Sequence, residues 1–207
     1  MINTGANTMR RYLCCVMFLI TFVGSSLTDA QAKDSGRILF DFGQPNAAAR
    51  WQIVNDGVMG GRSTSRTEVV ADSQMRFAGT LSQEKNGGFA SVKSKLDSAR
   101  STSLGLKAGD VIVMRVQGHG RKYTFNLYLP DRRTAFSHQL ECQTQANQLK
   151  EIQLPIDRFV AHSFGRPVRG ATLDPARVHS PGILLGDKRA GEFQIIVDWI
   201  KVVPAPK

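Results

Sequence analysis

The residues that could carry catalytic or metal chemistry are few and scattered along this sequence. Its four histidines have no spacing typical of a zinc site: they are His119, His138, His162 and His179. The sequence holds no phosphate-binding loop, no dinucleotide-binding glycine motif after a strand, no metalloprotease helix and no serine-nucleophile elbow. We therefore expect no metal, no cofactor and no catalytic residue.

Two catalytic alternatives stay open on residue type alone. Cys142 could pair with a histidine as a nucleophile, although it falls in a predicted strand. Asp56, Glu84 and Asp187 could serve a hydrolase, which would need two carboxylates roughly 5–10 Å apart in a cleft. Sequence spacing does not decide whether any two of them meet.

The densest group of special residues is the segment Trp51–Ser63, which reads WQIVNDGVMGGRS. Its two turn signals are Asn55-Asp56-Gly57 and Gly60-Gly61, and glycine adopts positive φ without strain. Two interpretations follow. The segment is a tight connection in which Asp56 bonds the backbone, or it is a recognition loop that turns Asn55, Asp56 and Arg62 toward a ligand.

The elements that must position this segment are short strands separated by turns. Alternating apolar residues place Met75, Phe77 and Leu81 on one face of a strand. Asn86-Gly87-Gly88 after that strand predicts a hairpin to the strand 89–96. The remaining predicted strands share β-branched or alternating apolar residues: 38–42, 51–54, 111–116, 123–129, 134–142, 150–156, 183–185 and 193–203.

Ten or eleven such strands predict an all-β fold, an antiparallel β-sandwich or barrel. Helical turns are expected only near 46–50 and 155–159. No linker or repeat interrupts the pattern, so residues 33–207 are expected to form a single β-sandwich domain.

The first 32 residues are typical of a secretory signal peptide. Arg10 and Arg11 precede a 12-residue apolar run, Tyr12–Val23, and Ala30-Gln31-Ala32 resembles a cleavage site. We expect residues 1–32 to be removed, with export to a bacterial periplasm, and no transmembrane segment to follow the cleaved signal. An uncleaved membrane anchor is the alternative.

Cleavage would change the composition only slightly. Of 207 residues, 175 would remain, and the formal charge would fall from +10 to +9 because two arginines and one aspartate leave. Cys142 would be the single remaining cysteine, either buried or paired between chains. The basic residues suggest anionic surroundings or a solvated surface: they include Arg62, Arg66, Arg121, Lys122, Arg132, Arg133, Arg166 and Arg169.

Several motifs together resemble the family of complex I intermediate-associated protein 30 (CIA30). Trp51–Ser63, with its core Asn55–Ser63, resembles the opening motif of the family. Phe77–Ser82 resembles its F-x-G-x-L-S, and Asn86–Val92 its N-G-G-F-A-S-V. The weaker blocks that follow are Gly118–Tyr123, Ile152–Pro155 with Phe159, Phe164–Arg166, Gly182–Arg189 and Gly191–Phe193. The resemblance runs from about residue 39 to 200. His119 departs from it, since the family turn has an acidic residue there.

The resemblance implies a galactose-binding-domain-like jelly roll and a non-catalytic role as an assembly factor or chaperone for NADH:ubiquinone oxidoreductase. A protein partner is therefore expected, and nucleic acid is disfavoured by export. We expect ligand or partner contacts from Asn55, Asp56, Arg62, Asn86, Arg121, Tyr123 and Arg166. The residues expected to shape the motif are Trp51, Gly57, Met59, Gly60, Gly61, Gly87, Gly88 and Phe89.

A β-sandwich that binds a glycan or an anionic envelope polymer is the alternative function. Jelly-roll modules bind such ligands on loops or on a sheet face, where aromatic rings stack on sugars. The aromatic residues that could do so, or pack in the core instead, are Trp51, Tyr123, Tyr128 and Trp199.

Overall fold

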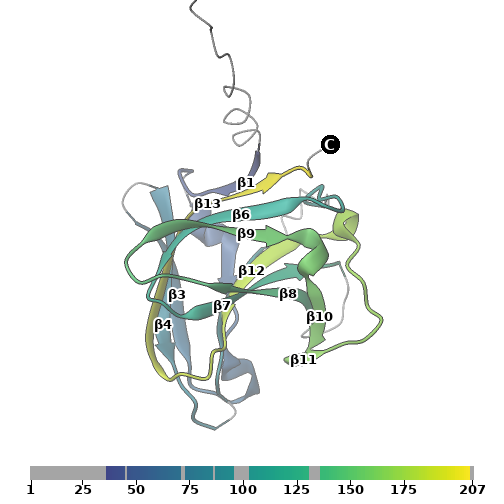
Figure 1. The fold of residues 1–207 in the computed structure, drawn as a ribbon. Helices are drawn as coiled ribbons and strands as arrows, with labels where there is room; N and C mark the ends of the chain where they lie inside the picture. Colours follow the sequence, from purple (N-terminus) through teal and green to yellow (C-terminus); the bar gives the residue numbers. More distant parts are fainter. Residues whose placement is uncertain are drawn as a thin grey trace, which may run out of the picture. The chain divides into compact units, whose positions relative to one another are not determined.

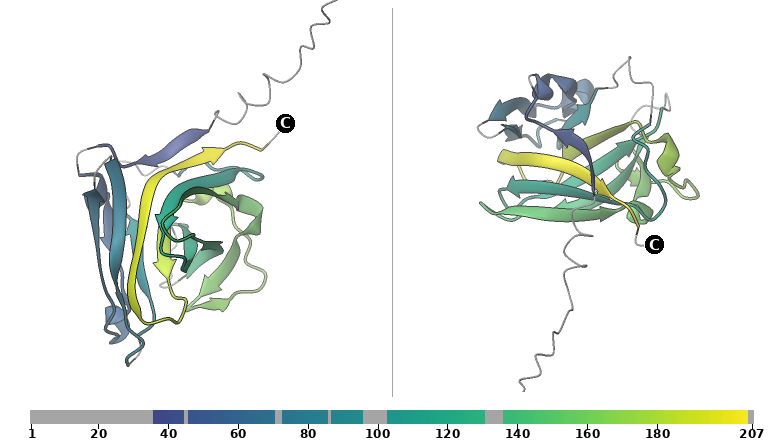
Figure 2. Two further views of the ribbon diagram at one scale, coloured as in Figure 1. Left: turned by 60° about the vertical axis from the view of Figure 1, so that its left-hand side comes forward. Right: turned by 90° about the horizontal axis from the view of Figure 1, so that it is seen from above.

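Two antiparallel sheets make up the fold in the computed structural model, which describes residues 36–44, 46–70, 73–85, 87–95, 103–130 and 136–205. The signal-peptide prediction for residues 1–32 and the site prediction for Asn86 lie outside these residues. Figure 1 and Figure 2 show the sheets stacked face to face. The prediction of an all-β antiparallel sandwich is confirmed.

The first sheet has six strands in the order β3-β4-β13-β6-β9, and β1 pairs with β13 beyond this path. Its strands are β1 (Arg37–Asp41), β3 (Thr64–Val70), β4 (Gln74–Leu81), β6 (Val111–Gly118), β9 (Leu149–Pro155) and β13 (Gly191–Val203). The last of these, β13, pairs with three strands and carries a bulge between Val197 and Trp199.

The second sheet has seven strands in the order β11-β10-β8-β7-β12-β5-β2. Its strands are β2 (Trp51–Ile53), β5 (Ala90–Ser94), β7 (Lys122–Tyr128), β8 (Phe136–Gln143), β10 (Val160–Ser163), β11 (Arg166–Pro167) and β12 (Ser180–Leu185). Short 3-10 turns complete the described elements: η2 (Ala47–Arg50), η3 (Asp56–Met59), η5 (Ile156–Arg158) and η6 (Pro175–Arg177).

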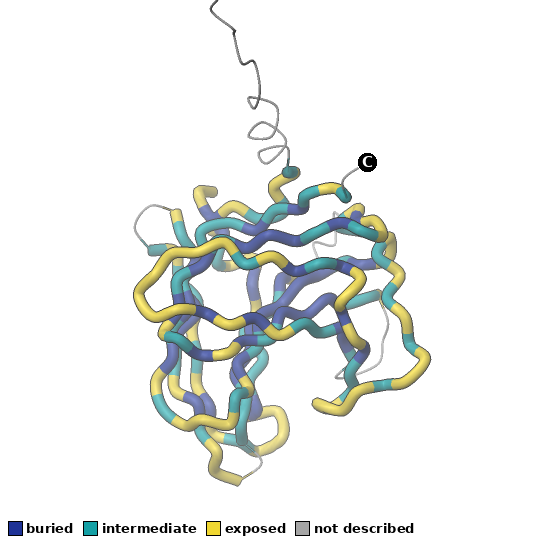
Figure 3. Tube along the Cα trace, viewed as in Figure 1, coloured by how far each residue is buried: buried dark blue, intermediate teal, exposed yellow. Residues whose placement is uncertain are grey.

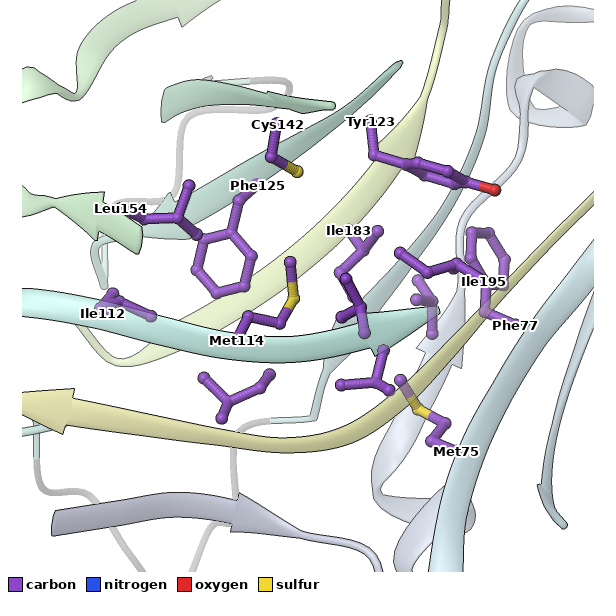
Figure 4. Close-up of a cluster of buried hydrophobic side chains, with 14 of the residues drawn as sticks. Met75, Phe77, Ile112, Met114, Tyr123, Phe125, Cys142, Leu154, Ile183 and Ile195 are labelled. Carbon is purple, nitrogen blue, oxygen red and sulfur yellow. The ribbon is translucent and has the colours of Figure 1, made fainter. Parts of the chain in front are cut away.

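Apolar side chains from both sheets fill the space between them (Figure 4), and Figure 3 shows the buried residues along both sheets. The alternation predicted for β4 is confirmed, since Met75, Phe77 and Leu81 are at most 1% exposed. Phe125 and Tyr123 of β7 face them from the second sheet, each fully buried. Cys142 lies in the same core, and burial raises the pKa of its thiol to about 12.

The predicted hairpin at Asn86-Gly87 is wrong. β4 belongs to the six-stranded sheet and β5 to the seven-stranded sheet, so residues 82–89 cross from one sheet to the other. The glycines serve a different purpose there, because they let this connection pack against the segment around Asp56. The predicted turns near 46–50 and 155–159 are present as η2 and η5.

Candidate functional site

Four loops gather at one end of the sandwich, and they contain most of the motif residues. Residues 54–63 connect β2 to β3 and residues 82–89 connect β4 to β5, so both loops pass between the sheets. Residues 119–121 connect β6 to β7, and residues 186–190 connect β12 to β13. The strand register places them together, because Leu185 pairs with both Ala90 and Tyr123. We call these four loops the motif end.

Asp56 holds the first two loops together. Its carboxylate is 0% exposed and accepts four hydrogen bonds, from Ser63 N (2.9 Å), Ser63 Oγ (2.5 Å), Gly88 N (2.7 Å) and Phe89 N (3.2 Å). Burial alone would raise the pKa of this carboxyl, but these bonds outweigh it and hold the pKa below its ordinary value. Asp56 is therefore an anion sealed inside the loops, with no surface to offer a ligand directly.

Asn55 reinforces the same junction. Its Oδ1 accepts hydrogen bonds from Ser65 Oγ (2.9 Å) and Ser91 N (3.3 Å), and its Nδ2 donates to Ser63 O (3.5 Å). The backbone adds two further bonds, from Val54 N to Ser91 O and from Asp56 N to Phe89 O. The structure thus supports the interpretation of a tight connection rather than one in which Asn55 and Asp56 face outward.

The glycines of the motif make room for this packing. A Cβ at Gly61 would lie 2.5 Å from Asp56 Cγ, and one at Gly87 would lie 2.6 Å from Ser82 O. Gly60 has φ +88° and ends η3. Gly57, by contrast, has open space around it. Positive φ thus explains Gly60, and the close approach of neighbouring atoms explains Gly61 and Gly87.

Arg121 ties the other two loops together. Its guanidinium forms a bidentate pair with Asp187 (2.9 and 2.6 Å) and also donates to the carbonyls of Arg189, Gly191 and Glu192. Both side chains are 6% exposed. Burial would raise the pKa of the Asp187 carboxyl, but the hydrogen bonds from Arg121 and Arg189 lower it overall.

The remaining predicted site residues are spread over the fold. Arg62 forms an exposed ion pair with Glu84 (2.7 Å) that links the first two loops at the surface. Trp51 and Tyr123 are core residues, and Trp51 packs edge-on against Phe40 at 5.1 Å. The hydroxyl of Tyr123 has no hydrogen-bond partner, and burial raises its pKa. Arg166 lies in β11, at the edge strand of the seven-stranded sheet farthest from β2.

The tip of η3 carries the large apolar side chains that the motif end exposes. Val58 is 75% and Met59 is 45% exposed. Sequence reasoning missed Val58, although an apolar residue set between glycines in a polar turn is a signal that could have identified it. An apolar pair on a rigid loop is suited to contact with another macromolecule.

The carboxylates named for a hydrolase are all engaged within the fold. Asp56 and Asp187 are buried and ionised, and Glu84 pairs with Arg62 at the surface. Within the described ranges, no cluster of three or more His, Cys, Asp or Glu residues could hold a metal ion. In that same part of the chain, no helix has the length and apolar character needed to span a membrane.

Comparison with known families adds a match that covers most of the sequence. Residues 40–197 match the family described as complex I intermediate-associated protein 30 (CIA30). The chain belongs to the CIA30 family. A relative from Drosophila melanogaster, "Complex I intermediate-associated protein 30, mitochondrial", is 28% identical over 181 residues, which cover 79% of this chain. The chain spans 61% of the length of that relative.

Solved structures with this fold include carbohydrate-binding proteins. A family 11 carbohydrate-binding module from Clostridium thermocellum, in complex with a β-1,3-1,4-mixed-linked tetrasaccharide, has a TM-score of 0.59 and 14% identity, covering 83% of this chain and 97% of the module. An agarase has a TM-score of 0.57 and 10% identity, covering 83% of this chain and 25% of the enzyme. At these identities the likeness shows the shared β-sandwich alone.

Proposed function

We propose that this CIA30-family chain is a non-catalytic, assembly-factor-like module that binds a protein partner through its motif end. One observation carries the proposal. The polar residues of the family motif are used inside the fold, and the rigid loop that they hold presents Val58 and Met59 to solvent. Anchoring apolar side chains on a preorganised loop lowers the entropy cost of binding.

A crosslinking experiment tests this proposal. A photoreactive amino acid at position 58 should crosslink one protein in extracts of the source organism, whereas the same group at Val69 should not. Val69 of β3 is 42% exposed and lies at the end of its strand away from the motif end, so it is a matched control. Val58→Asp should abolish the capture of that protein and Val69→Asp should not. Equal capture by both variants, or none above a charge-matched control protein, would rule the proposal out.

Glycan binding is the second candidate, because one sheet face carries the residues for it. Tyr123, Phe125 and Leu127 of β7 face the core, so Asn126 and Tyr128 lie on the outer face. A hydrogen-bonded row crosses this face, from Gln139 Nε2 to Ser137 Oγ (3.0 Å) and from Ser137 Oγ to Asn126 Oδ1 (2.9 Å). Asn126 and Ser137 are at most 4% exposed, so the groups left to contact a sugar or a related envelope polymer are the half-buried Gln139 amide and the Tyr128 ring, which has Lys93 Nζ 3.8 Å from its centroid.

A glycan array and a pulldown on cell-wall polymer separate the two candidates. Glycan binding predicts a signal that Tyr128→Ala removes and Val58→Asp leaves unchanged. Trp51 and Tyr123 are excluded as stacking residues by their burial, at 4% and 0% exposure. Trp199 of β13 is half-buried and belongs to the other sheet, so Trp199→Ala is the negative control.

Export to a periplasm stays part of the proposal. It rests on the basic start, the apolar run and the Ala30-Gln31-Ala32 site of the sequence. Cell fractionation and the mass of the purified protein test it. Export predicts a periplasmic protein that begins at Lys33, whereas a cytoplasmic protein of full mass would contradict it.

A further inference from the structure

The hairpin β10–β11 has an unusual residue at its tip. Ser163 pairs with Arg166, so Phe164 and Gly165 alone make the turn, with φ 48° and 73°. A two-residue turn with positive φ at both positions strongly favours Asn-Gly. A bulky residue such as phenylalanine is strained in this region of φ.

The strain at Phe164 is not offset by burial. Its side chain is 67% exposed, the second most exposed of the large apolar residues in the described chain. The backbone below is well held, because Val168 N donates to Ala161 O (2.8 Å) and β10 pairs with β8. A strained, solvent-facing aromatic residue on a firm base points to a function at the tip.

The charged residues of the hairpin and of the segment after it have one sign. No Asp or Glu occurs between Arg158 and Leu173 in the sequence. Arg166 and Arg169 are exposed, and the ion pairs found among the described residues include neither. This edge of the sheet therefore presents an exposed aromatic residue at the hairpin tip and two exposed arginines that follow it in the sequence. Val160, 49% exposed, lies on the same hairpin.

We propose that the β10–β11 hairpin is a membrane-contact site, which places Phe164 in the interface of a bilayer while Arg166 and Arg169 bind its anionic phosphate headgroups. A stable protein interface needs about 1,000 Å² or more of buried surface, which one hairpin tip does not supply without neighbouring loops such as those of the motif end. A bilayer interface needs only an amphipathic insertion and basic residues near the headgroups. This site is separate from the motif end, since β11 and β2 are opposite edges of one sheet, and Figure 1 shows β11 on the side of the molecule away from β3 and β4.

Fluorescence at the tip tests the proposal directly. In the Phe164→Trp chain, vesicles of equal parts phosphatidylglycerol and phosphatidylcholine should shift the emission of the introduced indole to the blue, and brominated lipid should quench it. The unmodified chain, with Trp51 and Trp199, supplies the background, and a Val69→Trp chain is the matched control. The readout is local, so vesicle binding through any other segment leaves it unchanged.

Three variants separate insertion from a structural role. Phe164→Asn should weaken vesicle binding at the tip about tenfold, as expected for losing one buried aromatic side chain, while the melting temperature stays level or rises because Asn tolerates this φ. Arg166→Gln and Arg169→Gln should each weaken binding to the anionic vesicles about fivefold.

Two results would overturn the membrane site. One is an emission from the Phe164→Trp chain that brominated lipid quenches no more than it quenches the unmodified chain. The other is a Phe164→Asn chain that binds the anionic vesicles as well as the unmodified chain. If the Phe164→Trp chain were quenched equally in vesicles of phosphatidylcholine alone and in the anionic vesicles, Arg166 and Arg169 would not bind anionic headgroups.

Discussion

Asp56 and Asp187 are two buried carboxylates at the same end of the sandwich, but the fold stabilises their negative charges in different ways. Asp56 is surrounded by backbone N–H groups and the Ser63 hydroxyl, and no cation of the described residues bonds to it. Asp187 faces the guanidinium of Arg121 in a bidentate pair. Both pKa values are held below the ordinary value, that of Asp56 by the Ser63 hydroxyl and backbone N–H groups and that of Asp187 chiefly by hydrogen bonds from the Arg121 guanidinium.

The difference determines what can replace each group. A side-chain pair such as Arg121–Asp187 can be exchanged as a unit for apolar residues of similar volume. The donors around Asp56 are mostly main-chain groups, which no substitution removes. The Asp56 junction is therefore the less replaceable of the two, and the following experiments test that ranking.

The largest effect is expected from Asp56→Ala. Removing this acceptor leaves the amides of Ser63, Gly88 and Phe89 without their partner, so the free energy of unfolding should fall by about 4 kcal/mol. Urea denaturation measures the loss, and Glu84→Ala on the adjacent loop is the control. A loss under about 1 kcal/mol would show that water or a rearranged loop replaces the carboxylate.

Arg121→Met should cost somewhat less, about 3 kcal/mol, because it leaves Asp187 buried without its cation. Adding Asp187→Leu should restore about 2 kcal/mol of that loss, since neither charge then remains. A double-mutant cycle by urea denaturation gives both numbers. If the double variant were no more stable than Arg121→Met alone, the Arg121–Asp187 pair would be as hard to replace as the Asp56 junction, contrary to the ranking above.

Gly61→Ala tests the space around Asp56. Its Cβ would meet the Asp56 carboxyl at 2.5 Å, so the overpacked loop should lose about 2 kcal/mol. Gly57→Ala is the matched control in the same loop, because its Cβ would meet nothing within 4 Å and should change stability by less than about 0.5 kcal/mol. Equal melting temperatures for the two variants would contradict this account of the motif.

Acid should destabilise the fold through both carboxylates. Their folded pKa values lie below the ordinary value of 3.8, so the unfolded chain binds protons first as the pH falls. The stabilisation is complete above about pH 5 and is lost as the pH drops through the folded values, at up to about 1.4 kcal/mol per pH unit for each proton. Between about pH 5 and pH 3, the free energy of unfolding of Asp187→Asn should fall less steeply with decreasing pH than that of the unmodified chain, by the uptake of up to about one proton. An unchanged slope would show that the pKa of this carboxyl is the same in the folded and the unfolded chain.

The smallest effect is expected at the surface pair of the same end. Arg62 and Glu84 are 57% and 65% exposed, so Arg62→Ala should change stability by about 0.5 kcal/mol or less. High salt should erase even this difference. If Arg62→Ala lowered the free energy of unfolding nearly as much as Arg121→Met, the exposed and the buried ion pair would contribute equally to stability, against this prediction.

The fold could be predicted from periodicity because its strands alternate cleanly. Met75, Phe77 and Leu81 were placed on one face, and all three are buried. β3, β10 and β11 were missed. β3 exposes polar residues on both sides and lies at a sheet edge, and β10 and β11 have only four and two residues. The Asn86-Gly87 hairpin was wrong because a turn signal does not say which sheet the next strand joins.

The site was predicted only in part, because hydrogen-bond partners distant in sequence carry no local signal. The tight-connection interpretation anticipated that Asp56 bonds the backbone, but not that its donors include Gly88 and Phe89, which lie 32 and 33 positions away. The partner of Arg121, Asp187, is 66 positions away. For Tyr123, its place in an alternating strand already favoured the core over a surface role. A binding role for Arg62 and Arg166 stays a prediction.

The central position of β13 determines when the protein can fold during its synthesis. β13 lies between β4 and β6 and also pairs with β1. A nascent chain that has reached residue 190 therefore lacks the central strand of its six-stranded sheet. Contacts between residues far apart in the sequence form slowly. The sandwich can therefore close only after β13 has been synthesised, and until then β1, β4 and β6 lack the strand that they share.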